Sequence, residues 1–275
     1  MIFAFFWFLW AGKDLIDYND IHSIQSLSFN QNFSEVSNIT IHGGLADTIT
    51  LTVAEQTQVT ANITGHPEAI FAVRESRNFI IGSDKNNIDF TSCPWFKKCP
   101  AISRLVSIEV IIPFDFSGNI FVYGVAPSIF VSSPRLTDNI QYLAINTADS
   151  SIEITNISSD IFINTAKLDL TLTNTSNNLS VNSTSTNVNY YPGESVSSDL
   201  NISSGFAEIS IHQMPVKGVI IESTGINTTM IENQIETRYF ASQTFEYDYL
   251  ESEHKIDISI NALYAIIHVD KKITP

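Results

Sequence analysis

Hydrophobic and polar residues alternate along most of the chain. The alternation is clear in TITLTV (48–53), LVSIEVII (105–112) and KIDISI (255–260), where Ile, Val, Leu and Thr dominate. A period of two places the apolar side chains on one face of a β-strand, whereas an amphipathic helix needs a period of about 3.6. β-Branched residues are also those that pleated strands favour. The pattern predicts an all-β protein and no convincing helix.

Short apolar pairs recur at nearly constant spacing between about residues 119 and 222. The pairs begin at Ile120, Ile129, Leu143, Ile152, Ile161, Leu170, Leu179, Val188, Leu200, Ile209 and Val219. Of the ten intervals between these positions, seven are nine residues long, one is ten, and the others are twelve and fourteen. A spacing of about eight to twelve residues also suits a β-sandwich or a meander, so the spacing alone does not choose a fold.

The connectors between the pairs favour one of these folds. Tight hairpins prefer Asn-Gly or Asp-Gly, because both central residues need a positive φ. The connectors TNISSD (155–160) and NSTSTN (182–187) contain no Gly. Their Asn and Ser residues can turn the chain through side-chain-to-backbone bonds and stack as ladders. We therefore predict a short β-solenoid of ~9-residue strand-turn units, two per coil, with about five coils in a stack ~25 Å long.

The change in pattern along the chain suggests four segments. We expect a signal peptide at 1–12, a β-rich N-terminal cap region at 13–118, β-solenoid repeats at 119–229 and a C-terminal β cap at 230–275. The caps are expected because the open ends of a solenoid expose backbone donors and acceptors.

The first residues predict secretion. Ile2 to Ala11 form an apolar run that is too short to span a bilayer and suits the core of a signal peptide. No Lys or Arg precedes the run, and the alternative interpretation is a buried first strand. No second apolar run approaches about eighteen residues, and the C-terminal HVDKKITP is no lipid-anchor signal. We expect a secreted or cell-surface protein without a membrane span after signal removal.

Two further features suit an extracellular protein. Cys93 and Cys99 are the only cysteines, and their even number and close spacing predict a disulfide. A zinc site is not expected there, because two ligands are too few and no His lies near. Asn-x-Ser/Thr acceptor sites for glycosylation occur at Asn32, Asn38, Asn62, Asn156, Asn174, Asn178, Asn182, Asn201 and Asn227, more often than the composition alone would give.

The charge of the chain limits its partners. The net charge is −15, the isoelectric point is near 4.6, and no basic stripe is present. Such a protein repels nucleic acid and anionic membranes, so neither is an expected partner. Solubility is the simplest role of this acidity.

The strand-plus-Pro phrase and the repeats that follow it resemble a known group of proteins. VSIEVIIPFDFSGNIFVYGVAPSIFV (106–131), followed by SSIEITNISSDIFI (150–163), is similar to the "putative adhesin" β-solenoid families, including the autotransporter adhesin-head (GIN-type) domain. The resemblance covers roughly residues 35 to 225. It implies a β-solenoid and an adhesin-like role, and it supplies no catalytic residues. The Gly-Asp turns common in those families are mostly replaced here by Asn, Ser and Thr.

A search for catalytic chemistry finds little. None of the six His residues has metal-ligand spacing, and no nucleophile elbow or phosphate loop is present, so we expect no metal, cofactor or enzymatic activity. Some β-helices cleave polysaccharides with paired carboxylates. An eighteen-residue coil would align Glu153, Thr171 and Asn189 on one face, and Phe162 and Ser180 on the other. Asp149, Asp160 and Asp169 remain candidates if the register shifts, although turn and edge residues that keep strands soluble are the simpler interpretation.

The cysteine loop is the best candidate for recognition. Trp95, Phe96, Lys97 and Lys98 lie between the cysteines, and aromatic side chains on a rigid loop supply contact area at a low entropy cost. The alternative is that the two rings pack into the cap as core. A second aromatic series is interpreted as the packing face of the C-terminal cap rather than a sugar platform; it comprises Tyr239, Phe240, Phe245, Tyr247 and Tyr249.

The sequence thus predicts a non-catalytic, adhesin-like β-solenoid that binds cell-surface glycans or proteins. Two alternatives stay open. A carbohydrate-active β-helix enzyme requires a groove lined by clustered Asp, Glu and Arg. A structural coat component predicts self-association through the coil ends.

Overall fold

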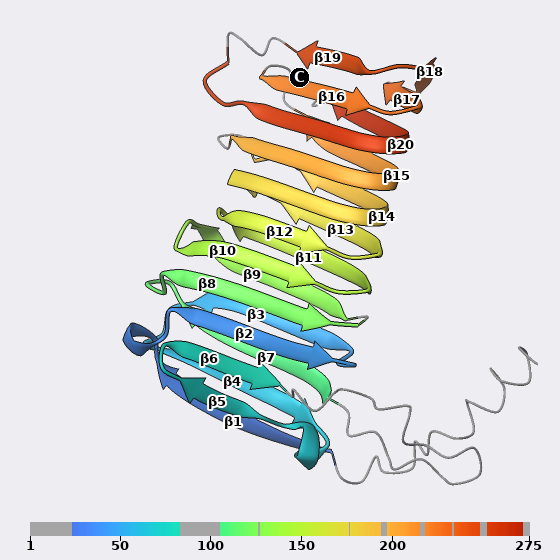
Figure 1. Cartoon of the computed structure of the whole chain (residues 1–275). Helices are drawn as coiled ribbons and strands as arrows, with labels where there is room; N and C mark the ends of the chain where they lie inside the picture. Colours follow the sequence, from blue (N-terminus) through green and yellow to red (C-terminus); the bar gives the residue numbers. More distant parts are fainter. Residues whose placement is uncertain are drawn as a thin grey trace, which may run out of the picture.

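The computed structural model describes residues 24–82, 105–125, 127–175, 177–193, 197–214, 218–232, 234–247 and 252–271. These residues form twenty β-strands and two 3₁₀ turns (Figure 1). In chain order the elements are β1 (Gln25–Asn32), η2 (Phe33–Glu35), β2 (Asn38–Gly44), β3 (Thr48–Ala54), β4 (Gln58–Gly65), η3 (Pro67–Ala69), β5 (Ala72–Glu75), β6 (Asn78–Gly82), β7 (Leu105–Pro113), β8 (Gly118–Gly124), β9 (Ser128–Thr137), β10 (Ile140–Asn146), β11 (Asp149–Ile157), β12 (Asp160–Asn164), β13 (Lys167–Thr173), β14 (Asn177–Tyr191), β15 (Ser198–Met214), β16 (Val219–Thr224), β17 (Asn227–Glu232), β18 (Ile235–Tyr239), β19 (Gln243–Tyr247) and β20 (Ile256–Lys271).

The twenty strands belong to one sheet that winds back on itself and nearly closes around a single core (Figure 1). The all-β class predicted from the alternation is confirmed. In the middle of the chain each strand pairs in parallel with the strand eighteen residues further on, as Leu143 does with Ile161 and Ile161 with Leu179. We call two consecutive strands, one on each face of the sheet, a rung. The first face of the sheet carries β8, β10 and β12, and the second face carries β9, β11 and β13.

The core consists of columns of apolar side chains that run from rung to rung. On the first face one column contains Ile120, Leu143, Ile161, Leu179, Leu200, Ile258 and Ile221. On the second face another contains Ile129, Ile152, Leu170, Val188, Ile209, Ile267 and Met230. All of these side chains are buried. Parallel, in-register pairing therefore explains why the apolar pair repeats along the chain.

The turns between rungs use the polar residues that the connectors supply. Asn156 and Asn174 adopt positive φ angles of 58° and 49°, which Asn tolerates better than most residues. The Asn174 Nδ2 donates to Asn156 Oδ1 at 2.8 Å, and the Asn156 Nδ2 donates to the Ser133 carbonyl oxygen at 2.8 Å. At the opposite corner, Ser183 and Ser204 on neighbouring rungs lie 3.0 Å apart through their Oγ atoms. The predicted ladders of Asn and Ser are therefore present.

The order of the strands in the stack differs from their order in the chain at both ends. β20 lies between β15 and the rung of β16 and β17, with Leu200 and Ile221 both paired to Ile258. Near the other end, β2 and β3 form a rung between β6 with β7 and β8 with β9. Segments expected as caps at 13–118 and 230–275 thus contribute internal rungs. Their strands have the same alternation as the repeats, so they fit the same stacking positions.

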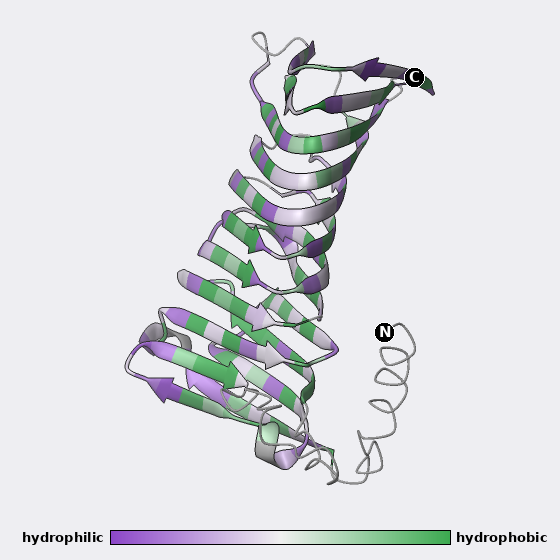
Figure 2. Ribbon diagram, turned by 45° about the vertical axis from the view of Figure 1, so that its right-hand side comes forward, coloured by the Kyte–Doolittle hydropathy of each residue, from purple (hydrophilic) through white to green (hydrophobic). Residues whose placement is uncertain are grey.

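Antiparallel strands finish each end of the sheet. β4 pairs with β7 and with β1, and β5 pairs with β6. At the opposite end β18 pairs with β17 and β19 with β16, so the chain runs back over its last rung before it enters β20 (Figure 1). Hydrophobic and hydrophilic residues alternate along the strands of the stack (Figure 2), and most of the hydrophobic ones are buried.

Candidate functional site

The cysteine loop is not among the residues that the structure describes. Its residues outside the described ranges are Cys93, Trp95, Phe96, Lys97, Lys98 and Cys99. The expected signal peptide at 1–12 and Tyr249 also lie outside these ranges. The disulfide, the recognition loop and the secretion signal therefore stay predictions.

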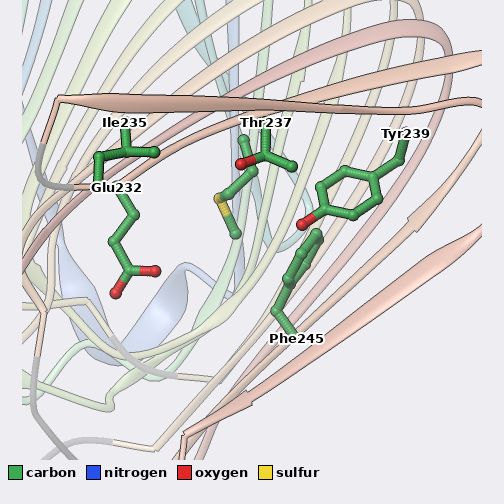
Figure 3. Close-up of a pocket in the computed structure, with 6 residues that line it drawn as sticks. Glu232, Ile235, Thr237, Tyr239 and Phe245 are labelled. Atoms are coloured by element: carbon green, nitrogen blue, oxygen red, sulfur yellow. The ribbon is translucent and has the colours of Figure 1, made fainter.

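A cavity of about 310 Å³ lies at the end of the stack that β16 to β19 finish (Figure 3). We call it the end pocket. It is lined by Met230, Glu232, Ile235, Thr237, Tyr239 and Phe245. Met230 and Glu232 come from β17, Phe245 comes from β19, and the other three residues come from β18. The pocket thus lies at the last rung of the described part of the chain, that of β16 and β17.

Alternation along the antiparallel strands places these side chains. Ile235, Thr237 and Tyr239 are every second residue of β18, so they share one face. Tyr239 and Phe245 pack partly on the core, and their rings meet edge to face with centroids 5.4 Å apart. Three residues of the aromatic series, Tyr239, Phe245 and Tyr247, thus pack partly on the core, and two of them also line the pocket. Phe240, which follows β18, is 79% exposed.

Glu232 breaks the pattern of an interior column. On earlier rungs the corresponding inward position holds an apolar or aromatic side chain, namely Val131, Ile154, Leu172, Tyr190, Ile211 and Val269. Glu232 pairs with Val269 and continues this column on the last rung. Its side chain is one of those that line the end pocket (Figure 3).

The Glu232 carboxylate affects the pKa of a tyrosine at this end of the stack. The pKa of Tyr247 is raised from 10.0 to about 12, first because the side chain is partly desolvated and then because Glu232 and Tyr239 disfavour a second negative charge. The end pocket is therefore a cavity of mixed polar and apolar lining that contains a carboxylate.

The rows of side chains on the outer faces follow the predicted register. Glu153 pairs with Thr171, and Thr171 with Asn189. On the first face Phe162 pairs with Ser180. These rows bring no carboxylate pair together.

The three aspartates that were candidates under a shifted register also have other partners. Asp149 pairs with Lys167, and Asp169 with Asn187. Asp160 accepts a hydrogen bond from Asn178 Nδ2 at 3.1 Å. Each aspartate lies on an outer face and is exposed.

The insertion of β20 creates pairs that the sequence alone does not reveal. Asp199 and Asp257 become neighbours on the first face. On the second face the Nε2 of His268 lies 3.3 Å from Glu208 Oε1. The Nδ1 of His212 lies 3.5 Å from Asp270 Oδ2. These pairs could be predicted from the sequence only if it were known which strand lies beside β15.

The ring of Tyr191 stacks on His212 beside these pairs, with centroids 4.4 Å apart. Within the described ranges, no three His, Cys, Asp or Glu side chains are arranged to hold a metal ion. The same part of the chain contains no helix of the length and apolarity that a membrane span requires.

The nine acceptor asparagines are in the described part and differ in their surroundings. Asn38 donates to Asn78 Oδ1 at 2.7 Å and accepts from Asn119 at 3.0 Å. Asn156 and Asn174 belong to the turn ladder. Asn178, Asn182 and Asn201, by contrast, are exposed on the first face. A structural role for Asn thus accounts for part of the excess of acceptor sites.

Comparisons with known proteins find only distant similarity. No family model and no curated protein matches the chain. A solved "putative cell adhesion protein" from Clostridium sporogenes is 10% identical, with a TM-score of 0.39 over 90% of this chain and 100% of that one. A "putative adhesin" from Bacteroides fragilis is 12% identical, with a TM-score of 0.32 over 89% and 97%. A "putative lipid binding protein" from Parabacteroides distasonis is 11% identical, with a TM-score of 0.37 over 90% and 97%. At these values no ligand or role is carried over to this chain.

Proposed function

We propose that this chain is a secreted or surface-displayed, adhesin-like protein that acts by binding and has no catalytic role. Its wound sheet is a short β-solenoid that serves as a rigid stalk, and the end pocket is its recognition site. The partners are glycans or proteins of cell surfaces. The observation that carries this proposal is the cavity at the end of the stack, where Tyr239 and Phe245 lie beside Glu232 and Thr237, because ligand sites are concave and combine aromatic side chains with a few polar groups.

The outer faces support a stalk rather than a catalytic groove. Ser151, Asp169 and Asn187 form one row on the second face, and Glu153, Thr171 and Asn189 form the next. Small polar side chains of this kind keep a sheet soluble and discourage pairing of its faces with other chains. A polysaccharide-cleaving enzyme needs two carboxylates across the scissile bond. The neighbouring Asp199 and Asp257 are the pair that this alternative would use.

The proposal is tested by binding of the secreted chain, residues 13 to 275, to an array of glycans and cell-surface proteins. Two double variants locate the site: Tyr239→Ala with Phe245→Ala in the end pocket, and Trp95→Ala with Phe96→Ala in the cysteine loop. Phe130→Ala, which alters an exposed ring on the second face, is the matched control. We expect specific binding that the end-pocket variant loses and the control retains.

Other outcomes contradict parts of the proposal. Loss only in the Trp95 and Phe96 variant would move recognition to the cysteine loop. No binding by the wild-type chain would contradict the binding role itself. Release of reducing sugar from a polysaccharide, abolished by Asp199→Asn, would show that the chain is an enzyme.

A further inference from the structure

The two ends of the sheet differ in how their outermost strands are protected from pairing with other chains. Four strands of the described part pair with a single other strand, namely β1, β5, β18 and β19. Such edge strands expose a row of N–H and C=O groups, and proteins protect them with charged residues, Pro, bulges or short length. β5, β18 and β19 have four or five residues, and each contains at least one Glu or Arg. These three strands are therefore protected.

β1 has none of these protections. It is eight residues long, and its sequence QSLSFNQN (25–32) contains no charged residue, Pro or Gly. Its register with β4 runs without a shift from Gln25 to Asn32, so no bulge turns its edge away. Thr60 Oγ1 of β4 donates to Asn30 Oδ1 at 2.8 Å, which helps to hold β1 in place. Within the described residues, the second edge of β1 is thus a regular template for another strand.

The core continues onto β1 and is incompletely covered there. Leu27 and Phe29 lie opposite the buried Ile63 and Ala61 of β4, so their side chains share the inward face of the sheet. Phe29 packs partly on the core, whereas Leu27 is 45% exposed. A strand added beside β1 would remove apolar surface from water and would also pair the backbone groups of the edge.

The distribution of charge favours a second copy of the chain as the source of the added strand. The net charge of −15 makes two copies repel each other, so a contact between them costs least where charge is absent. Neither β1 nor its neighbour β4 contains a charged residue. Glu35, which follows β1, is paired with Arg74. Two copies that meet at β1 therefore bring no strand charges of the same sign together.

Antiparallel pairing of β1 with itself also matches the inward faces of the two copies. A two-fold axis perpendicular to the sheet turns the same face of each copy inward. An axis through Ser28 places Leu27 of one copy opposite Phe29 of the other. Both copies use the same surface in such a contact, so association stops at two.

We propose that two copies of this chain associate end to end through antiparallel pairing of their β1 strands. β16 to β19 finish the opposite end of the sheet (Figure 1), so the two end pockets lie at the two tips of this dimer. The pairing does not depend on what the end pocket binds. It would give a protein that acts by binding two sites in one particle, and so raise its avidity for a surface.

Sedimentation of the full-length protein over a range of concentrations tests the proposal. One pair of strands is a small contact, so we expect a monomer–dimer equilibrium with a Kd of roughly 1 to 100 μM. Ser28→Lys places two like charges opposite each other at the axis and should weaken the dimer about tenfold. Ser151→Lys adds the same charge at an exposed position of β11, which is paired on both sides. It is the matched control and should associate as the wild type does.

Cross-linking locates the contact, in a background with Cys93→Ser and Cys99→Ser. Residues directly opposite each other in an antiparallel pair have Cα atoms about 4.5 to 5.5 Å apart, which a disulfide can bridge. Ser28→Cys should therefore form a disulfide between two copies, and Ser151→Cys should not. Ser28 and Ser151 are both exposed, so these variants should unfold in urea as the wild type does at low protein concentration.

Four results would overturn the inference. A protein that stays monomeric up to about 1 mM would leave the edge of β1 to another occupant, such as residues 1–23 or a peptide of another protein. Association that Ser28→Lys leaves unchanged would place the contact elsewhere, including at residues 1–23, which the variants share with the wild type. Species larger than two copies would contradict the closed two-fold contact. Cross-linking of Ser28→Cys no faster than that of Ser151→Cys would contradict the pairing of β1 with itself.

Discussion

Tyr190 shows how a single polar atom is accommodated in the core. Its side chain is fully buried. Its hydroxyl donates to Ser198 Oγ at 3.0 Å, and that Oγ donates to the Thr175 carbonyl oxygen at 2.8 Å. This relay satisfies the hydroxyl where the column would otherwise need an aliphatic side chain.

Burial raises the pKa of Tyr190 to about 12, and the hydrogen bond with Ser198 opposes the shift only in part. A raised folded-state pKa stabilises the fold fully below the unfolded value of about 10, and this contribution is lost as the pH rises towards about 12. We expect Tyr190→Phe to cost about 1 kcal/mol at pH 8 but to lose less stability than the wild type between pH 10 and 12. Urea unfolding at both ends of that range measures the difference, and equal alkaline losses would contradict the assignment.

Asn174 has both a strained backbone and a ladder hydrogen bond. Asn174→Ala keeps the β-carbon at a φ of 49° but removes the amide that makes this backbone conformation tolerable, so we expect a loss of about 2 kcal/mol. Asn174→Gly removes the amide and the β-carbon together, so it relieves the backbone strain and should cost less. Chemical unfolding of both variants ranks them, and an alanine variant as stable as the glycine variant would show that φ contributes nothing.

At the scale of elements, periodicity predicts each strand but not its neighbour. The nine-residue spacing correctly predicts the eighteen-residue register of β10 to β14. The unit at Val219 follows the unit at Ile209 by ten residues in the chain, yet β20 lies between β15 and β16. In the first-face column, Ile258 of β20 stands between Leu200 and Ile221. Every strand with alternating Ile, Leu and Val fits such a column, so the pattern alone cannot decide which strand fills which position.

Because the pattern does not fix the order of the strands, the end pocket could be predicted from the sequence only in part. The aromatic residues near 239–249 were recognisable as a packing face, and Tyr239 and Phe245 do pack on the core. That Glu232 faces inward depends on its pairing with Val269 of β20, which the sequence does not reveal. The direction of a side chain follows from strand register, and register here follows from the inserted strand.

Gly218 connects three strands at the end of the stack through its backbone hydrogen bonds. Its N–H donates to the Tyr247 carbonyl oxygen at 2.7 Å, and its carbonyl oxygen accepts from the Ile256 N–H at 2.8 Å, which ties β16 to β19 and β20. Its φ is +83°, and a β-carbon would lie 2.3 Å from the His254 carbonyl oxygen.

We therefore expect Gly218→Ala to destabilise the protein by at least about 2 kcal/mol and to shift the NMR signal of the Met230 methyl group. Gly124→Ala is a suitable control, because there the β-carbon would lie 3.0 Å from the Pro127 side chain and 3.8 Å from the Gly44 carbonyl oxygen, the nearest backbone atom beyond its chain neighbours. A Gly218→Ala protein as stable as the Gly124→Ala protein would contradict the described junction.

At the scale of the whole molecule, both ends of the sheet depend on a strand from elsewhere in the chain. β2 and β3 form an internal rung near one end, and β20 forms one near the other. The last segment of the chain therefore holds β16 to β19, and with them the end pocket, against the rest of the stack. The recognition site proposed here exists only if β20 is inside the stack.

Disulfide cross-linking tests that placement most directly, in a background with Cys93→Ser and Cys99→Ser. Asn201 and Glu222 both pair with Ser259. Adjacent strands are about 4.8 Å apart and next-but-one strands about 9.6 Å, and a disulfide cannot bridge Cα atoms more than about 7 Å apart. Asn201→Cys with Ser259→Cys should therefore cross-link readily, and Asn201→Cys with Glu222→Cys should not. The reverse result would place β16 directly beside β15 and contradict this account of the end pocket.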